Sequence, residues 1–204
     1  MTIDWPPMYE PVDAADAAAN VCARQVLKER QERSESADGV LCYAMSPNQC
    51  ALSFILEGDA TVDLTLTRFA IMNAVADALG ASLPPMLPVT HTADGTLFLD
   101  GGIIGSIDIE FDSEPERSRE TRSCIATCTL ALSGEASTIQ SLSGELLNAD
   151  ELSARIARYV LTWIETWQDR GFEPVRQAWN VRCQERLTKT AAGIDAHGKM
   201  SLVA

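Results

Sequence analysis

Apolar and polar residues follow a regular local pattern between residues 94 and 111. A short apolar run, Leu97 to Leu99, leads into the turn sequence Asp100-Gly101-Gly102, and the chain alternates from residue 103 to residue 111. One face of this alternating segment carries Ile103, Gly105, Ile107, Ile109 and Phe111, and the other carries Ile104, Ser106, Asp108 and Glu110. Two such runs joined by Asp-Gly-Gly predict a β-hairpin, whose glycines would let the backbone closely approach a ligand or a packed neighbour.

Helical and strand patterns divide the rest of the chain. Apolar residues recur at helical spacing in residues 14–31, 65–79, 148–170 and 173–185. Alternation predicts strands at residues 39–45, 50–56 and 123–133, and a closing hairpin at residues 193–203. This order of elements predicts an α+β fold, in which a largely antiparallel sheet carries helices on one face.

Capping and breaking residues mark the ends of these segments. Thr65 is the expected cap of the second helix, and Gly80 is expected to end it in a left-handed conformation. Asn148 is the expected N-cap of the third helix, with Glu151 as its capping-box partner, and Gly171 ends that helix. Prolines make residues 2–12 and 82–92 extended, and residues 112–122 and 134–147 are expected to be loops.

Composition and charge restrict the class of protein. The chain has 204 residues, of which 46% are apolar, so one domain, or one domain with a small appendage, and an ordinary core are expected. A net charge of -13 argues against nucleic acid and anionic membrane as partners, because both require a cationic surface. No apolar run approaches the length of a membrane span and the first 20 residues lack a leader pattern, so a cytoplasmic location is expected. Six scattered cysteines predict reduced thiols.

Positive charge is unevenly distributed along the chain. Between Ser34 and Glu116, Arg68 is the only lysine or arginine. The middle of the protein, including the central hairpin, therefore offers almost no cation to an anionic ligand.

Cysteine and histidine give weak signals for catalysis. Cys124 and Cys128 lie four residues apart on a predicted strand, a separation of roughly 13 Å that is too long for one zinc ion, so buried thiols are expected. The two histidines, His91 and His197, lie in extended or turn segments with no nucleophile beside them, so surface or turn histidines are expected. The glycines of the hairpin do not form a phosphate loop, because neither a helix nor a lysine follows them.

Two further groups have a functional and a structural interpretation. Asp108 and Glu110 share a face of the hairpin, as a carboxylate pair of a hydrolase would, but no sugar-binding aromatic residue lies near them in sequence. Trp163, Trp167 and Trp179 fall at helical spacing on apolar faces, which favours packing over an aromatic binding site.

Four segments together resemble the biotin/lipoate protein ligase family, in particular a divergent branch of short bacterial proteins. They are Pro6 to Val12, Pro88 to Thr90 followed by Thr96 to Ile107, Gly171 to Val175, and Gly193 to Leu202. The resemblance implies a class II synthetase-like fold, a mixed sheet flanked by helices, over residues 1–190. Residues 191–204 would then be the remnant of a truncated C-terminal cap. Members of the family use ATP and magnesium to activate biotin or lipoate and pass it to a lysine of a carrier domain.

The active-site positions of the family fall on residues of different chemistry here. The arginine-glycine loop falls on residues 44–47, the Trp-Pro-Asn-Asp-like stretch on residues 93–96, and the catalytic lysine on Ile103. The resemblance therefore implies no catalytic residue and no metal ligand, and the cofactor is left unassigned. The candidate ligand-binding residues that it implies are Met45, Thr96, Gly101, Gly102, Ile103 and Gly105.

Three functions are compatible with these observations. The first is a ligase-fold protein with an eroded, non-catalytic site that binds a small acyl-type or apolar ligand or a protein partner. It follows from the shortage of cations, because the negative charge that develops during adenylation needs preorganised cations or donors. The second is an active biotin, lipoate or octanoyl transferase that acts on a carrier-domain lysine with relocated catalytic groups. One variant of it would dispense with ATP and use an exposed cysteine of depressed pKa among Cys42, Cys50, Cys124 and Cys128. The third is a structural homodimer, and a homo-oligomer is expected in any case.

Overall fold

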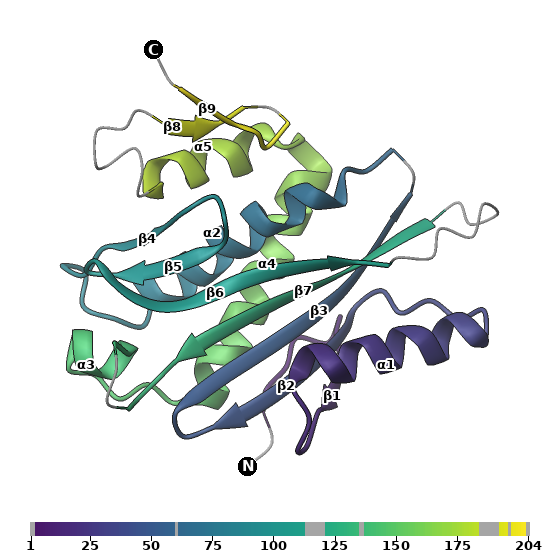
Figure 1. Ribbon diagram of the computed structural model, residues 1–204, viewed down its shortest axis with the longest axis horizontal. Helices are drawn as coiled ribbons and strands as arrows, with labels where there is room; N and C mark the ends of the chain where they lie inside the picture. Colours follow the sequence, from purple (N-terminus) through teal and green to yellow (C-terminus); the bar gives the residue numbers. More distant parts are fainter. Residues whose placement is uncertain are drawn as a thin grey trace.

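A single twisted sheet organises the computed structural model, which describes residues 3–59, 61–112, 121–134, 137–183, 192–195 and 197–202. Within these residues, seven strands lie in the order β1-β2-β3-β7-β6-β5-β4 (Figure 1). They are β1 (Glu10–Asp13), β2 (Val40–Ser46), β3 (Gln49–Asp59), β4 (Val89–His91), β5 (Thr96–Leu99), β6 (Gly102–Phe111) and β7 (Thr121–Ala131). β1 and β2 pair in parallel and the other neighbours pair antiparallel, which confirms the predicted mixed, largely antiparallel sheet.

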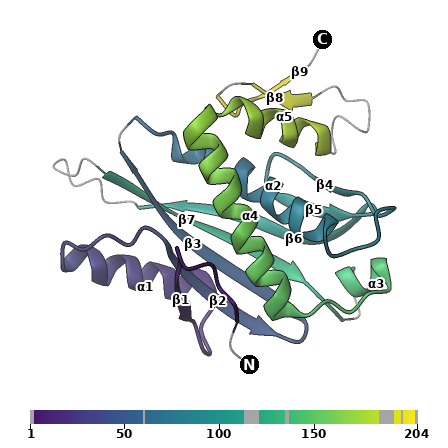
Figure 2. The same ribbon diagram turned by 180° about the vertical axis from the view of Figure 1, so that it is seen from behind.

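Helices cover both faces of the sheet, and the prediction that they cover one face is wrong. Figures 1 and 2 show α1 (Ala19–Glu32) on one face and α2 (Thr67–Gly80), α4 (Ala149–Arg170) and α5 (Glu173–Arg182) on the other. The short elements are η1 (Leu64–Leu66), α3 (Ile139–Ser143) and a separate hairpin of β8 (Ala192–Ile194) and β9 (Met200–Leu202). Helices lie on both faces because β2, β3 and β7 carry apolar residues on both faces, and each apolar face is buried by packing against helices.

Two hydrophobic clusters hold these layers together. The larger lies between the sheet and α2, α4 and α5, and includes fully buried Phe54, Met72 and Trp179. The smaller lies under α1, where Ala23 and Leu27 pack on Val40, Cys42 and Ile55. Because α1 contributes a narrow stripe of small residues, it lies close to the sheet and covers only part of that face.

The predicted central hairpin is confirmed as β5 and β6. Its turn places Asp100 and Gly101 at φ 47° and 80°, conformations that favour glycine. A β-bulge interrupts the pairing, since Phe98 pairs with Ile103 while Leu97 pairs with Gly105.

This bulge corrects the predicted alternation at the start of β6. Ile104 turns into the core and is 1% exposed, whereas Ile103 is 56% exposed. The extra residue in the strand exchanges their faces, so Ile103 does not share a face with buried Ile107.

Several predicted boundaries differ from the structure because tertiary contacts create short elements. The extended segments contain the edge strands β1 and β4, the loop at residues 134–147 contains α3, and the first helix begins at Ala19. Asp63, not Thr65, caps the start of the second helical region by accepting a hydrogen bond from the Thr65 amide. Gly80 is the last residue of α2 and is not left-handed, so its predicted conformation is wrong, although the helix ends within one residue of the predicted position.

The predicted N-cap and the predicted last residue of the third helix are confirmed, whereas the predicted capping box is not, because only the Asn148 side chain forms its half of it. The Asn148 side chain accepts hydrogen bonds from the amides of Asp150 and Glu151 at 2.9 and 3.1 Å, and Gly171 ends α4 at φ 74°. The predicted loop at residues 113–120, the last residues of the final helix (184–185) and the end of the closing hairpin (203) lie outside the described residues. Among the described helices, none is both long enough and apolar enough to cross a membrane.

The closing hairpin packs on α5. Asn180 donates to the Ile194 carbonyl at 3.4 Å and accepts from the Ile194 amide at 3.0 Å. This contact joins the β8 strand to the helical layer. The boundary at residue 190 between a ligase-like domain and a C-terminal cap stays a prediction.

Candidate functional site

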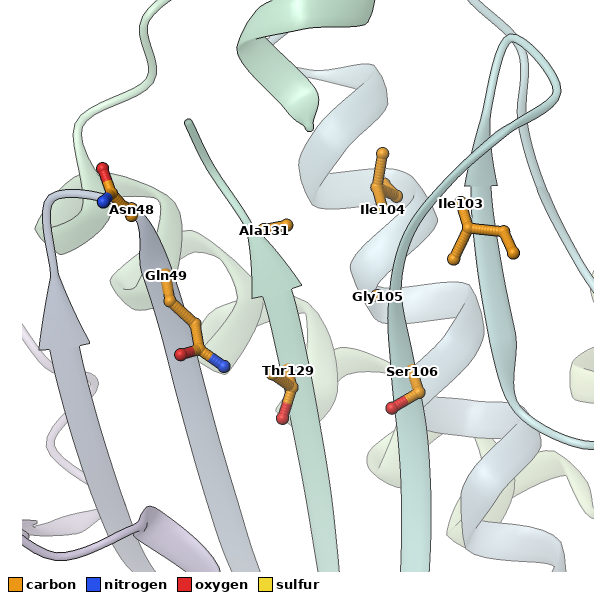
Figure 3. A pocket seen from close by; sticks show the side chains of 8 residues that line it. All are labelled: Asn48, Gln49, Ile103, Ile104, Gly105, Ser106, Thr129 and Ala131. Carbon is orange, nitrogen blue, oxygen red and sulfur yellow. The ribbon is translucent and has the colours of Figure 1, made fainter. Parts of the chain in front are cut away.

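An open trough lies on the face of the sheet that α1 covers only in part. It consists of two adjoining hollows of about 410 and 240 Å³, which share Gln49 and Thr129. The larger is lined by Asn48, Gln49, Ile103, Ile104, Gly105, Ser106, Thr129 and Ala131 (Figure 3). The smaller extends to residues 17–20 at the start of α1 and to residues 44–46 of β2.

A row of small side chains forms the floor of this trough. Ala44 pairs with Ala51, Ala51 with Thr129, and Thr129 with Ser106, so the row crosses four neighbouring strands on one face. Side chains on one face of paired strands lie opposite each other, and small ones leave a depression in the sheet surface. α1 does not fill the depression, because the residues that lead into it, Ala17 to Ala19, are alanines and its apolar stripe faces the smaller core cluster.

The described lining residues are all uncharged. The polar groups among them are hydroxyls and amides, from Ser106, Thr127, Thr129, Asn48 and Gln49 among others. No lining residue of either hollow, within the described chain, is Asp, Glu, Lys, Arg, His or Cys. A ligand in this trough would therefore be held by shape and hydrogen bonds rather than by charge.

Carboxylates lie at the rim of the trough beside β6. Ser106 Oγ donates a hydrogen bond to Asp108 Oδ2 at 3.1 Å, and Asp108 is the cross-strand partner of the lining residue Thr127. Glu110, two residues further on, accepts from Asn20 Nδ2 at 3.1 Å and lies 3.5 Å from Arg24. The predicted carboxylate pair thus shares a face, but Glu110 holds α1 in place while Asp108 is exposed.

The structure brings three of the six predicted ligand-binding residues to the trough. Ile103 and Gly105 line the larger hollow, at the bulge of β6. A Cβ on Gly105 would lie 2.0 Å from the Thr129 carbonyl oxygen, so this glycine permits close packing of β6 on β7. Met45 borders the smaller hollow, but its side chain lies on the opposite face, where Ser153 Oγ is 3.4 Å from its sulfur.

The other three predicted residues lie outside the lining. Thr96 pairs with Ser106, but its hydroxyl donates to Asp94 at 3.0 Å. Gly101 forms the hairpin turn, and Gly102 packs against Leu142 of α3.

Sequence reasoning did not identify Gln49, Thr129 and Ser106 as site residues. Alternation along each strand indicates which of these residues share a face. The strand order that places them side by side is set by tertiary pairing, and no local pattern contains it.

The four candidate nucleophilic cysteines are all buried. Burial raises the pKa of Cys50 and Cys124 to about 11, and raises the pKa values of Cys42 and Cys128 as well. Cys50 Sγ lies 3.1 Å from Ser153 Oγ of α4, on the face away from the trough. The prediction of buried strand thiols at positions 124 and 128 is confirmed.

His91 is buried, and the prediction of a surface histidine is wrong at this position. Its side chain is 0% exposed and stacks on Trp179 with ring centroids 4.9 Å apart. Its Nε2 lies 3.0 Å from the Trp179 carbonyl oxygen, and burial lowers its pKa to about 4. The helix α5 folds over β4 and encloses the ring, which the local sequence around residue 91 does not indicate. His197 is exposed, as predicted.

A nucleotide triphosphate with magnesium, which the resemblance implies, does not fit the described lining. Phosphates need cations or convergent N–H donors, and magnesium needs carboxylate oxygens. Arg68 lies apart from the trough lining and donates to the Ala93 carbonyl at 3.2 Å. Across the described residues, no group of three or more His, Cys, Asp or Glu side chains gathers in a way that could hold a metal ion.

Comparison with known proteins places this fold. A biotin protein ligase-like protein of unknown function from Silicibacter sp. TM1040 superposes with a TM-score of 0.80 at 19% identity, over 100% of this chain and 94% of that one. Biotin protein ligase from Aquifex aeolicus in complex with biotin and ATP gives 0.64 at 11% identity, over 86% and 77% of the two chains. The Leishmania major enzyme in complex with biotinyl-5-AMP gives 0.60 at 11% identity, over 89% and 83%.

Sequence comparison gives the family. No curated protein matches the sequence. The profile of the biotin/lipoate A/B protein ligase family matches residues 5–181. The chain therefore belongs to the biotin/lipoate A/B protein ligase family.

Proposed function

We propose that this protein is a ligase-family member that does not adenylate and that binds a small ligand in the trough. The observation that carries the proposal is the uncharged lining across both hollows in the described residues. Activating a carboxylate with ATP places negative charge on the α-phosphate and on the leaving pyrophosphate. Removing even one preorganised donor of such charge typically costs a factor of about 10² to 10³ in rate.

Ile103 supports the loss of adenylating activity. The resemblance assigns the catalytic lysine to this position, and the side chain lines the larger hollow and is 56% exposed. An isoleucine here provides no positive charge for an acyl carboxylate or an α-phosphate. The Leishmania major relative holds biotinyl-5-AMP, an acyl phosphate anion, whereas this trough offers alanine, isoleucine, hydroxyl and amide groups.

Acyl transfer through a cysteine is the less favoured function. A nucleophilic thiol needs access and a depressed pKa, whereas the four candidate cysteines are buried and their pKa values are raised. Six free thiols, five of them buried, instead suit a reducing compartment, and we propose that the protein acts in the cytoplasm.

Homodimer formation through the sheet edges is also less favoured. β1 is a four-residue edge strand that contains Pro11 and ends in the exposed acids Glu10 and Asp13. β4 is covered by a bridge from His91 to Cys183. Short, charged or covered edges oppose strand pairing between copies, so a homo-oligomer would need another surface.

A labelling assay tests the proposal. The purified protein is incubated with ATP, magnesium and either biotin and a biotinyl domain or lipoate and a lipoyl domain. The Aquifex aeolicus biotin ligase serves as the positive control for the biotin reaction. We expect no ATP-dependent modification of either domain and no calorimetric heat on titration with ATP and magnesium. Modification that requires both this protein and ATP would refute the proposal.

A further inference from the structure

We infer that the trough selects ligands that end in an uncharged amide over the corresponding carboxylic acids. This inference rests on the proposed binding function and specifies the class of ligand. It reverses the preference that the family's chemistry needs, because a ligase must first bind a carboxylate.

Ser106 gives the trough its acceptor character. Its Oγ donates its one proton to Asp108 Oδ2 at 3.1 Å, so the lone pairs of the oxygen are left to face the hollow. A ligand that meets Ser106 must therefore donate. An amide N–H does so, whereas a carboxylate has no proton to give.

Charge at the rim acts in the same direction. The Asp108 carboxylate is exposed and bonded to a lining residue, and its cross-strand partner Thr127 belongs to the smaller hollow. Arg24 of α1 lies on that side of the sheet and is paired with Glu110 at 3.5 Å. An anionic ligand group beside Ser106 would thus lie close to a second negative charge.

The remaining described lining offers a carboxylate no cation to compensate for lost water. Ile103, Ala131, Ala44 and Ala51 present methyl groups, and Gln49 presents a neutral amide with one donor group and one acceptor. Burying part of an ionised carboxylate without a cation is costly, while a neutral amide would replace its lost water by hydrogen bonds to Gln49 and Ser106. The apolar stretch then receives the hydrocarbon part of the ligand.

Matched pairs of compounds test this selectivity directly. Biotin is compared with biotinamide, lipoate with lipoamide, and octanoate with octanamide, by thermal shift and by calorimetry at pH 7. Members of a pair share the hydrocarbon part and differ in charge. A like-charge contact at about 4 Å, even in water, changes affinity by about fivefold. We therefore expect at least one amide to bind about fivefold or more tightly than its acid.

Two pairs of variants separate charge from general effects. Ile103→Lys places an ammonium group in the trough, and since this position is 56% exposed the variant should fold. It should shift the affinity ratio toward the acid, whereas the control Met86→Lys, at a residue 86% exposed and outside the lining, should not. Asp108→Asn should reduce the preference for the amide, and the control Asp169→Asn, on exposed α4 surface, should leave it unchanged.

The outcomes distinguish this inference from the proposed function. The selectivity is overturned by any of three results: the acids bind as tightly as the amides or more tightly, no compound of the three pairs binds, or the ratio of amide to acid affinity is unchanged in Ile103→Lys. None of these results bears on the proposed absence of adenylation. ATP-dependent labelling of a carrier domain overturns the proposed function itself.

Discussion

Acidification should destabilise this protein through His91. The pKa of this residue falls from an ordinary 6.5 to about 4 in the folded protein, because the ring is fully buried against Trp179. Between these two values the unfolded chain binds a proton at His91 and the folded chain does not. The unfolded state therefore binds more protons, and stability must decrease as the pH falls below about 6.5.

The size of the effect follows from the two pKa values. Their difference corresponds to about 3 kcal/mol of unfolding free energy, most of which is lost by about pH 4 and all of it only at lower pH. At pH 6 the loss is about 1 kcal/mol, and at pH 5 it is about 2 kcal/mol. A loss of that size is a large fraction of the stability of an ordinary domain.

Denaturant unfolding at pH 7, 6 and 5, followed by tryptophan fluorescence, measures this loss. His91→Gln keeps a donor for the Trp179 carbonyl but cannot be protonated, so its stability should fall by about 2 kcal/mol less between pH 7 and pH 5 than that of the natural chain. His197→Gln removes the exposed histidine and is the matched control, whose pH dependence should equal that of the natural chain. The reasoning is refuted if His91→Gln and the natural chain lose the same free energy over this range.

Three further predictions concern packing, capping and thiol access. Gly105→Ala should lower the free energy of unfolding by about 3 kcal/mol, since its Cβ would lie 2.0 Å from the Thr129 carbonyl oxygen. Gly101→Ala, at φ 80° with open space around it, should lower it by only about 1 kcal/mol. Equal losses of unfolding free energy in the two variants, measured with denaturant, would contradict the packing argument. Asn148→Ala should remove about 1 kcal/mol of stability by uncapping α4, and an unchanged unfolding midpoint would show that the cap is unimportant. Iodoacetamide should modify half-buried Cys22 of the native protein well before the five buried thiols, and mass spectrometry showing uniform labelling would contradict their burial.

Local sequence determined much of the fold. The Asp-Gly-Gly turn and its flanking runs set the central hairpin, and Asn148 and Gly171 set the ends of α4, because each depends on neighbours within a few residues. The shortage of cations between residues 34 and 116 also anticipated that the lining residues from this segment carry no positive charge. The number of charged residues in a segment is read directly from the sequence and does not depend on the tertiary structure.

Tertiary structure alone decided which residues form the site. The bulge that exposes Ile103 and buries Ile104 depends on the register between β5 and β6, and the burial of His91 depends on α5 folding over β4. Gln49 and Thr129 meet because β3 pairs with β7, strands separated by more than 60 residues of chain. Periodicity reports which side of a strand a residue occupies, but the partner strand and the covering helix are selected by long-range burial of apolar surface. The sequence therefore specified the pieces and their charge, and the packing of distant segments specified the trough.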